Sequence, residues 1–173
     1  MSGNRVRLPF KLLLALGVLT AAACQPAAVP GTPDYAAMQQ PAVDVFLDAW
    51  NNGNLDGLDA VLSPDVRRRS PRGVSDANNL EELKAVVSGL RAEYPDAMVT
   101  ITEVHHLENL AFAFWTFTGT QAGTGTSVSV PGLTSVRYAD GKISEELVYY
   151  DTADWMMQLG YTMVAPDEGR APE

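Results

Sequence analysis

The period of the hydrophobic residues changes near Met98, and this change limits the folds open to the chain. Before this point apolar residues recur at helical spacing, and after it they alternate with a period of two. The alternating part predicts four strands, at 98–107, 110–120, 126–138 and 142–150, joined by turns at Glu108-Asn109, Gly123–Gly125 and Asp140-Gly141. Helices followed by a run of long strands predict an α+β fold, with helices packed on one face of a curved antiparallel sheet.

Helical patterns flank these strands. The first helix has one apolar face, formed by Val43, Phe46, Leu47 and Trp50. A short second helix carries Leu55, Leu58 and Leu62. A third is capped by Asn79, with Glu82 as its capping-box partner, and ends at Pro95. A last short helix starts at Asp151 and ends at Gly160.

The first 23 residues have the features of a signal peptide. Three basic residues, Arg5, Arg7 and Lys11, precede an apolar stretch, Leu12 to Ala23, that is too short to span a bilayer. Ala21-Ala22-Ala23-Cys24 then resembles a bacterial lipobox. We therefore expect export to the cell envelope with Cys24 as the lipid-modified first residue, in the outer membrane if the organism has one. Ordinary secretion with an incidental cysteine is the alternative.

The rest of the chain predicts one domain on a tether. Residues 24–40 are rich in proline and lack a hydrophobic period, so we expect them to be flexible. Residues 41–165 are long enough to bury a core, and 166–173 are expected to be a disordered tail. Because Cys24 is the only cysteine, the exported domain has no internal disulfide and depends on that core.

The charge of the chain excludes one class of partner. The sequence has 12 basic and 21 acidic residues, and loss of the signal peptide removes three basic residues, which leaves a net charge of −12. A balance of this kind argues against nucleic acid and against adhesion to anionic headgroups. Contact with a membrane is therefore expected through the lipid alone.

Several segments, in this order and at this spacing, resemble the SnoaL-like polyketide (ester) cyclases. The resemblance covers most of 41–161 and rests on Phe46–Asp56, Leu62–Val66, Tyr94-Pro95-Asp96, Trp115–Thr120, Val130-Pro131-Gly132, Arg137–Ile143, Glu145-Glu146, Tyr149-Tyr150-Asp151 and Gln158-Leu159-Gly160. It implies the cone-shaped fold of the nuclear-transport-factor-2-like (NTF2-like) superfamily, in which a curved sheet wraps around helices and a largely apolar pocket. It also implies a homodimer paired through the outer face of the sheet.

The same resemblance implies a set of pocket residues, which we expect to be Trp50, Arg69, Trp115, Gln121, Leu147 and Tyr149. Three of them depart from the family pattern: Arg69 and Gln121 stand where members often carry histidine, and Leu147 where they carry tryptophan. The loop after the central strand is also shortened, to Ala122–Gly125.

Asp151 matches the acid/base aspartate of the cyclases. Strand alternation places it on one face with Glu145, Leu147 and Tyr149, which is compatible with a position in the pocket. An ordinary helix N-cap is the alternative, because Asp151 also precedes a helix.

The remaining polar residues are less specific. Arg67, Arg68, Arg69 and Arg72 indicate a solvated strand edge, although an inward arginine such as Arg69 would suit an anionic group on a ligand. His105 and His106 are adjacent on a strand and face opposite sides, so they cannot readily share a metal ion. We expect neither a metal nor a cofactor.

Two functions follow as hypotheses. In the first, the domain is an enzyme that acts on a small, largely apolar carbonyl compound by cofactor-independent acid/base chemistry with Asp151. In the second, it binds a small ligand or a protein partner without turnover.

Overall fold

The computed structural model describes residues 31 and 33–164, and Pro33 onward forms one compact unit. The signal peptide, Cys24 and the tail 166–173 lie outside these residues. Within the described part, no helix is long and apolar enough to cross a membrane.

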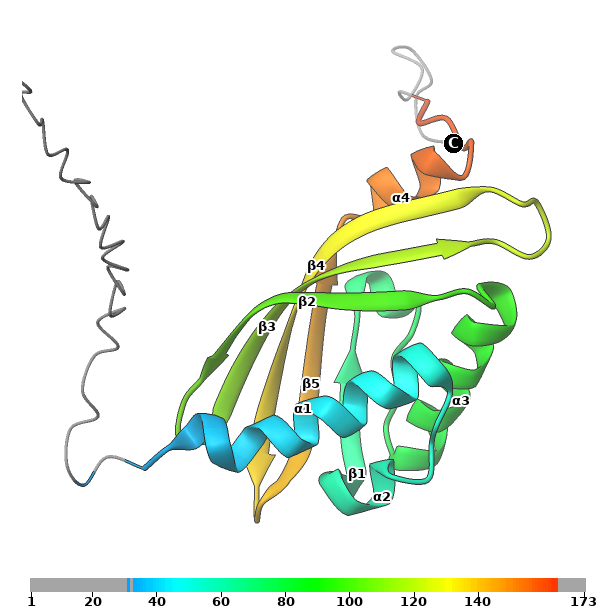
Figure 1. Ribbon diagram of the computed structural model, residues 1–173. Coiled ribbons are helices and arrows are strands. Elements are labelled where there is room, and N and C mark those ends of the chain that lie inside the picture. The colour runs from blue at the N-terminus through cyan, green and yellow to red at the C-terminus, as the bar shows by residue number, and fades with distance from the viewer. Residues whose placement is uncertain (1–30, 32, 165–173) are drawn as a thin grey trace, which may run out of the picture. The chain divides into compact units, whose positions relative to one another are not determined.

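Five strands form one curved, open sheet with the order β1-β5-β4-β3-β2 (Figure 1). The strands are β1 (Leu62–Arg69), β2 (Met98–His106), β3 (Leu110–Thr120), β4 (Ser127–Ala139) and β5 (Lys142–Tyr150). The last four form the antiparallel run that the sequence predicts, whereas β1 pairs in parallel with β5 at one edge. The turn at Asp140 and Gly141 has the positive φ angles, 52° and 75°, of a tight hairpin turn.

The helices of the N-terminal half, α1 (Tyr35–Asn52), α2 (Leu58–Val61) and α3 (Leu80–Glu93), are followed much later by α4 (Thr152–Gln158). Figure 1 shows α1 and α3 inside the curve of the sheet and α4 at its far end. The predicted α+β fold of the NTF2-like kind is confirmed.

Two boundaries differ from the prediction. Residues 35–40 are helical instead of belonging to the tether, because Asp34 caps α1 by accepting a hydrogen bond from the Ala37 amide at 3.0 Å. Leu62, which we expected at the end of the second helix, instead opens β1. The parallel pairing of β1 with β5 depends on residues about 80 positions apart, so no local pattern reports it.

The caps agree with the sequence. Asn79 accepts a hydrogen bond from the Glu82 amide at 2.9 Å, and the Glu82 carboxylate accepts one from the Asn78 amide at 2.8 Å. Helix α3 ends at Glu93, just before Pro95. Gly160 follows α4 with a φ of +90°.

Candidate functional site

A cavity of about 510 Å³ lies between the concave face of the sheet and the helices. Its volume is within the usual range for small-ligand sites, about 300–1,000 Å³. Most of its lining is apolar and comes from α1, α3, α4 and the four strands β2 to β5, including Phe46, Leu47, Trp50, Leu90, Tyr94, Ile101, Trp115, Phe117, Val136, Val148 and Trp155.

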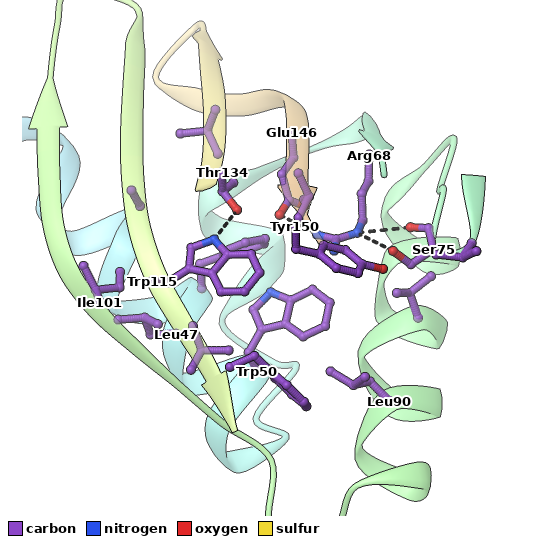
Figure 2. Close-up of a pocket in the computed structure, with 18 of the residues that line it drawn as sticks. Leu47, Trp50, Arg68, Ser75, Leu90, Ile101, Trp115, Thr134, Glu146 and Tyr150 are labelled. Atoms are coloured by element: carbon purple, nitrogen blue, oxygen red, sulfur yellow. Dashed lines mark hydrogen bonds and ion pairs between the residues drawn. The ribbon is translucent and has the colours of Figure 1, made fainter. Parts of the chain in front are cut away.

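One wall of the cavity holds a buried ion pair between Arg68 and Glu146 (Figure 2). The two residues face each other in the register of β1 and β5, and only 6% and 2% of their surfaces are exposed. The Arg68 guanidinium also lies over the Trp50 ring, 4.8 Å from its centroid. Removing either partner would leave an uncompensated buried charge, so each residue depends on the other.

The Arg68 side chain is held from a second direction by the segment between β1 and α3. Its Nε donates to the Ser75 carbonyl at 3.0 Å and lies 3.4 Å from the Ser75 hydroxyl. The strand itself is bridged to this segment through Ala77, since the two backbones exchange hydrogen bonds of 2.9 and 3.1 Å. Ser75 thereby fixes the guanidinium at the cavity wall.

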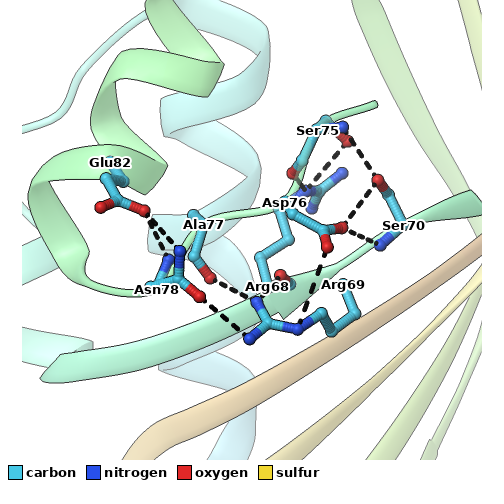
Figure 3. A network of polar contacts seen from close by, with 8 residues as sticks. All are labelled: Arg68, Arg69, Ser70, Ser75, Asp76, Ala77, Asn78 and Glu82. Atoms are coloured by element: carbon cyan, nitrogen blue, oxygen red, sulfur yellow. Dashed lines mark hydrogen bonds and ion pairs between the residues drawn. The ribbon is translucent and has the colours of Figure 1, made fainter. Parts of the chain in front are cut away.

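Arg69 lies beside this wall and stabilises the same segment (Figure 3). Its guanidinium donates to the Ala77 carbonyl at 2.9 Å and to Asn78 Oδ1 at 3.0 Å. Asp76 accepts hydrogen bonds from the Ser70 amide and hydroxyl at 2.8 and 3.2 Å. Arg69 is thus engaged in positioning the segment and does not line the cavity.

Several polar groups of the cavity wall have no partner among the described residues. Glu146 Oε2 is buried without a hydrogen bond, although an unmet buried acceptor costs about 1–3 kcal/mol. The Tyr150 hydroxyl and the Arg68 Nη2 group also make no hydrogen bond in this part of the chain. Burial raises the pKa of Tyr150, an effect that the charge of Arg68 opposes, so the phenol is a donor at neutral pH.

An aromatic cluster forms another part of the lining and adjoins Tyr150, whose ring centroid lies 5.4 Å from that of Trp155. Phe117 and Trp155 stack with their centroids 4.7 Å apart, and the Trp155 indole donates to the Tyr94 hydroxyl at 3.0 Å. Gln158 attaches α4 to β4, since its side chain exchanges hydrogen bonds of 2.8 and 3.0 Å with the backbone of Ser129. The short C-terminal helix is thereby held as part of the cavity wall.

Two of the predicted pocket residues, Trp50 and Trp115, line the cavity. The Trp115 indole donates to the Thr134 hydroxyl at 2.9 Å and lies against Gly132, where a Cβ would come within 2.2 Å of the ring. Glycine at this position leaves room for the indole.

Leu147 and Tyr149 do not line the cavity, and their prediction as pocket residues is wrong by one residue. The pairing of β4 with β5 contains a bulge at Ser144, because Arg137 pairs with Glu145 whereas Tyr138 pairs with Ile143. This extra residue reverses the faces of the strand. As a result Glu146, Val148 and Tyr150 point inward, whereas Tyr149 is 58% exposed.

Asp151 and Gln121 also lie outside the lining. Asp151 is exposed and caps α4 by accepting hydrogen bonds from the Ala153 and Asp154 amides at 2.9 and 3.0 Å, which is the alternative that the sequence left open. Gln121 sits at the base of the β3–β4 hairpin and donates to the Glu93 carboxylate at 2.9 Å. Neither side chain reaches the cavity.

Sequence reasoning missed Arg68, Glu146 and Tyr150 as a group. The run of arginines and the pair Glu145-Glu146 can be seen in the sequence. Which of these side chains faces the cavity depends on which alternate positions of each strand point inward. For β1 a signal existed, because Leu62 and Val66 are apolar at even positions and Arg68 continues that series. For β5 the bulge at Ser144 changes which alternate residues face inward, so simple alternation along the sequence gives the wrong face.

Among the residues that the structure describes, no three His, Cys, Asp or Glu side chains lie close enough together to hold a metal ion. His105 contacts Glu103 at 2.8 Å, and His106 contacts Gln39 at 2.9 Å. Each histidine has its own partner.

A curved sheet enclosing helices and an apolar cavity defines an NTF2-like domain. The family model for the SnoaL-like domain matches residues 43–146, so this chain belongs to the SnoaL-like family. None of the curated protein sequences matches it.

Solved structures agree with this assignment. TsrD from Streptomyces laurentii is 25% identical, with a TM-score of 0.65 over 72% of this chain and 96% of TsrD. IdmH from Streptomyces antibioticus, provisionally assigned as a polyketide cyclase, is 24% identical, with a TM-score of 0.62 over 70% of this chain and 98% of IdmH. A protein from Jannaschia sp. CCS1, provisionally assigned as a SnoaL-like polyketide cyclase, has a TM-score of 0.67 at 19% identity, over 76% and 98% of the two chains.

Proposed function

We propose that the cavity receives a small, largely apolar carbonyl compound and that the domain acts on it by cofactor-independent acid/base chemistry. The observation that carries this proposal is the wall of the cavity formed by Glu146, Arg68 and Tyr150. It combines one carboxylate with two kinds of hydrogen-bond donor inside an apolar enclosure. The proposal is compatible with the provisional assignment of two neighbours of the same fold as polyketide cyclases.

Each of the three residues has a role in the proposed reaction. The Glu146 carboxylate takes a proton from the carbon next to the substrate carbonyl. As the electron pair moves onto the carbonyl oxygen, the Tyr150 hydroxyl and the free N–H groups of Arg68 donate hydrogen bonds to the developing enolate. The apolar remainder of the cavity excludes water and holds the substrate skeleton.

Asp151 is the other carboxylate considered for this role. Its two backbone hydrogen bonds direct it to the start of α4, and it does not line the cavity. The proposal therefore assigns proton abstraction to Glu146 and a structural role to Asp151.

Exchange of substrate hydrogens tests the proposal without knowledge of the natural compound. We expect the protein to accelerate the exchange of the α-hydrogens of 2-tetralone in D₂O, followed by proton NMR. Glu146→Gln keeps the size of the side chain and should lower this rate by about 10²–10⁴-fold. Asp151→Asn, which preserves the cap, is the matched control and should leave it unchanged. Equal rates with and without the protein would refute the enzymatic proposal.

Binding without turnover is the second candidate. It is favoured by the mutual pairing of Arg68 and Glu146, because a purely structural ion pair would have the same geometry. The two candidates differ in the NMR experiment: under this second proposal 2-tetralone shows binding shifts but no exchange above the rate in buffer.

The location of the protein is also a proposal. We propose that residues 1–23 direct export and that Cys24 carries the lipid that attaches the domain to the cell envelope. The composition of the segment supports this, with three basic residues before an apolar stretch and small residues before the cysteine. Stable attachment needs more than one acyl chain, since one chain gives only marginal binding.

We further propose that two copies pair through the outer face of the sheet. Phe114, Leu133 and Tyr149 are register partners across β3, β4 and β5, and Phe114 and Tyr149 are 42% and 58% exposed. A row of large apolar side chains on the outer face is suited to an interface of ordinary size, about 1,600 Å² in total.

A further inference from the structure

The polar groups of the cavity are concentrated on one wall, and their charges nearly cancel. Three charged residues line the cavity: Arg68, Glu93 and Glu146. Arg68 is paired directly with Glu146, so its positive charge is already compensated. Glu93 lies at the end of α3, where Gln121 donates to its carboxylate. Glu93 is exposed to solvent and its carboxylate is held by Gln121, outside the lining, so the buried charges of the cavity wall cancel and leave no uncompensated cation.

The same wall offers both kinds of hydrogen-bonding group. Tyr150 and Arg68 Nη2 provide donors, whereas Glu146 Oε2 is an acceptor that lacks a donor from any described residue. Figure 2 shows Glu146 descending from β5 beside Arg68 and Tyr150, close to the Trp50 and Trp115 rings. An O–H or N–H group of an occupant that reached this oxygen would satisfy it.

We infer that the cavity selects neutral ligands that carry a hydroxyl or enol group at one end of an apolar ring system. This inference rests on the proposed use of the cavity for a small apolar compound and adds the charge and the polar group of that compound. A rotation of the Glu146 carboxyl presents Oε2 to the ligand hydroxyl, and the hydroxyl oxygen accepts from Tyr150 or Arg68. The rest of the ligand packs on the indoles of Trp50 and Trp115.

Charge explains why the ligand is neutral. An anionic ligand would find no free counter-charge, because Arg68 is the only cation among the described lining residues and it is paired with Glu146. A cationic ligand at the same wall would meet the Arg68 guanidinium. The expectation from the sequence that an inward arginine binds a carboxylate or phosphate therefore does not apply, since the inward arginine is Arg68 and its charge is already matched.

Three naphthalene derivatives of similar size test this inference on the unaltered protein. We expect 2-naphthol to bind at least tenfold more tightly than 2-methylnaphthalene, which lacks the hydroxyl, and than 2-naphthoate, which is an anion at pH 7. Isothermal titration calorimetry gives the three affinities. Equal binding of 2-naphthol and 2-methylnaphthalene would overturn the inference while leaving the cavity as an apolar binding site. Tighter binding of 2-naphthoate would overturn it as well, and no binding of any of the three would refute the use of the cavity itself.

Two variants test which residues recognise the hydroxyl group of 2-naphthol. Tyr150→Phe removes one donor and keeps the ring, so we expect the preference for 2-naphthol to fall severalfold. Replacing both members of the ion pair, Arg68→Met with Glu146→Leu, should abolish the preference while 2-methylnaphthalene still binds. A preference that persists in the double variant would show that the hydroxyl is recognised elsewhere and would refute the assignment.

Discussion

The ion pair of Arg68 and Glu146 makes a quantitative prediction about stability. Arg68→Met leaves the Glu146 carboxylate buried without a counter-charge, and Glu146→Leu does the same to Arg68. Breaking a buried pair from one side costs about 3–5 kcal/mol in the free energy of unfolding. Replacing both charges by apolar groups of similar size removes this penalty and is often neutral.

The structure adds one correction to the double variant. Arg68 also donates to the Ser75 carbonyl, and a hydrogen bond from a charged donor contributes about 1.5–3 kcal/mol. This contribution is lost in Arg68→Met and in the double variant alike. We therefore expect the double variant to lose about 1.5–3 kcal/mol, and the two single changes to add up to about 7.5–13 kcal/mol. The lost Ser75 bond enters both sums and cancels, so the coupling energy is about 6–10 kcal/mol.

Urea unfolding followed by circular dichroism measures all four corners of this cycle. Arg67→Met is the matched control, because Arg67 is exposed on the same strand and should change stability by less than about 0.5 kcal/mol. Additive losses in the cycle, or a double variant less stable than either single variant, would refute the argument that each charge is tolerated only because of the other.

Four further predictions concern residues outside this pair. Asp151→Asn should change stability by a few tenths of a kcal/mol and Asp151→Ala by about 1 kcal/mol, as thermal melts can show; equal melting of Ala and wild type would contradict the cap. Gly132→Ala should cost about 1–3 kcal/mol and displace the Trp115 indole, with a shift of its fluorescence, because the new Cβ would overlap the ring. Cys24→Ser should leave the protein unprocessed or released, and membrane-bound Ser variant after correct cleavage would exclude lipidation. Sedimentation should give twice the chain mass, and Tyr149→Lys should convert the dimer to a monomer; a wild-type monomer at micromolar concentration would exclude the interface.

Local sequence signals predicted the elements that depend on local interactions. Asn79 and Asp151 cap helices because their side chains reach amides two or three residues away, and Asp140-Gly141 turns because of its own backbone preference. These preferences act within a few residues, so they can be read directly from the sequence.

The residues of the cavity wall depend on distant pairing and could not be read in the same way. Ser144 gives no sign of a bulge, yet it decides whether Glu145 or Glu146 points inward. Likewise Arg68 and Arg69 are identical in type, and only the position of β1 against β5 separates the buried one from its neighbour. Trp50 and Trp115, which the resemblance implied as pocket residues, do line the cavity.

The parallel pairing of β1 with β5 has a consequence for how the protein matures. Arg68 and Glu146 are 78 residues apart, and they meet only when the final strand takes its place between β1 and β4. The N-terminal half, which includes Arg68, therefore cannot complete this pair until the chain through β5 is available to fold. Contacts of such long sequence separation form slowly, because the loop must close before they contribute. A chain interrupted before Glu146 would therefore carry an unmatched cation where the cavity should be, and quality-control proteases could distinguish it from the finished domain.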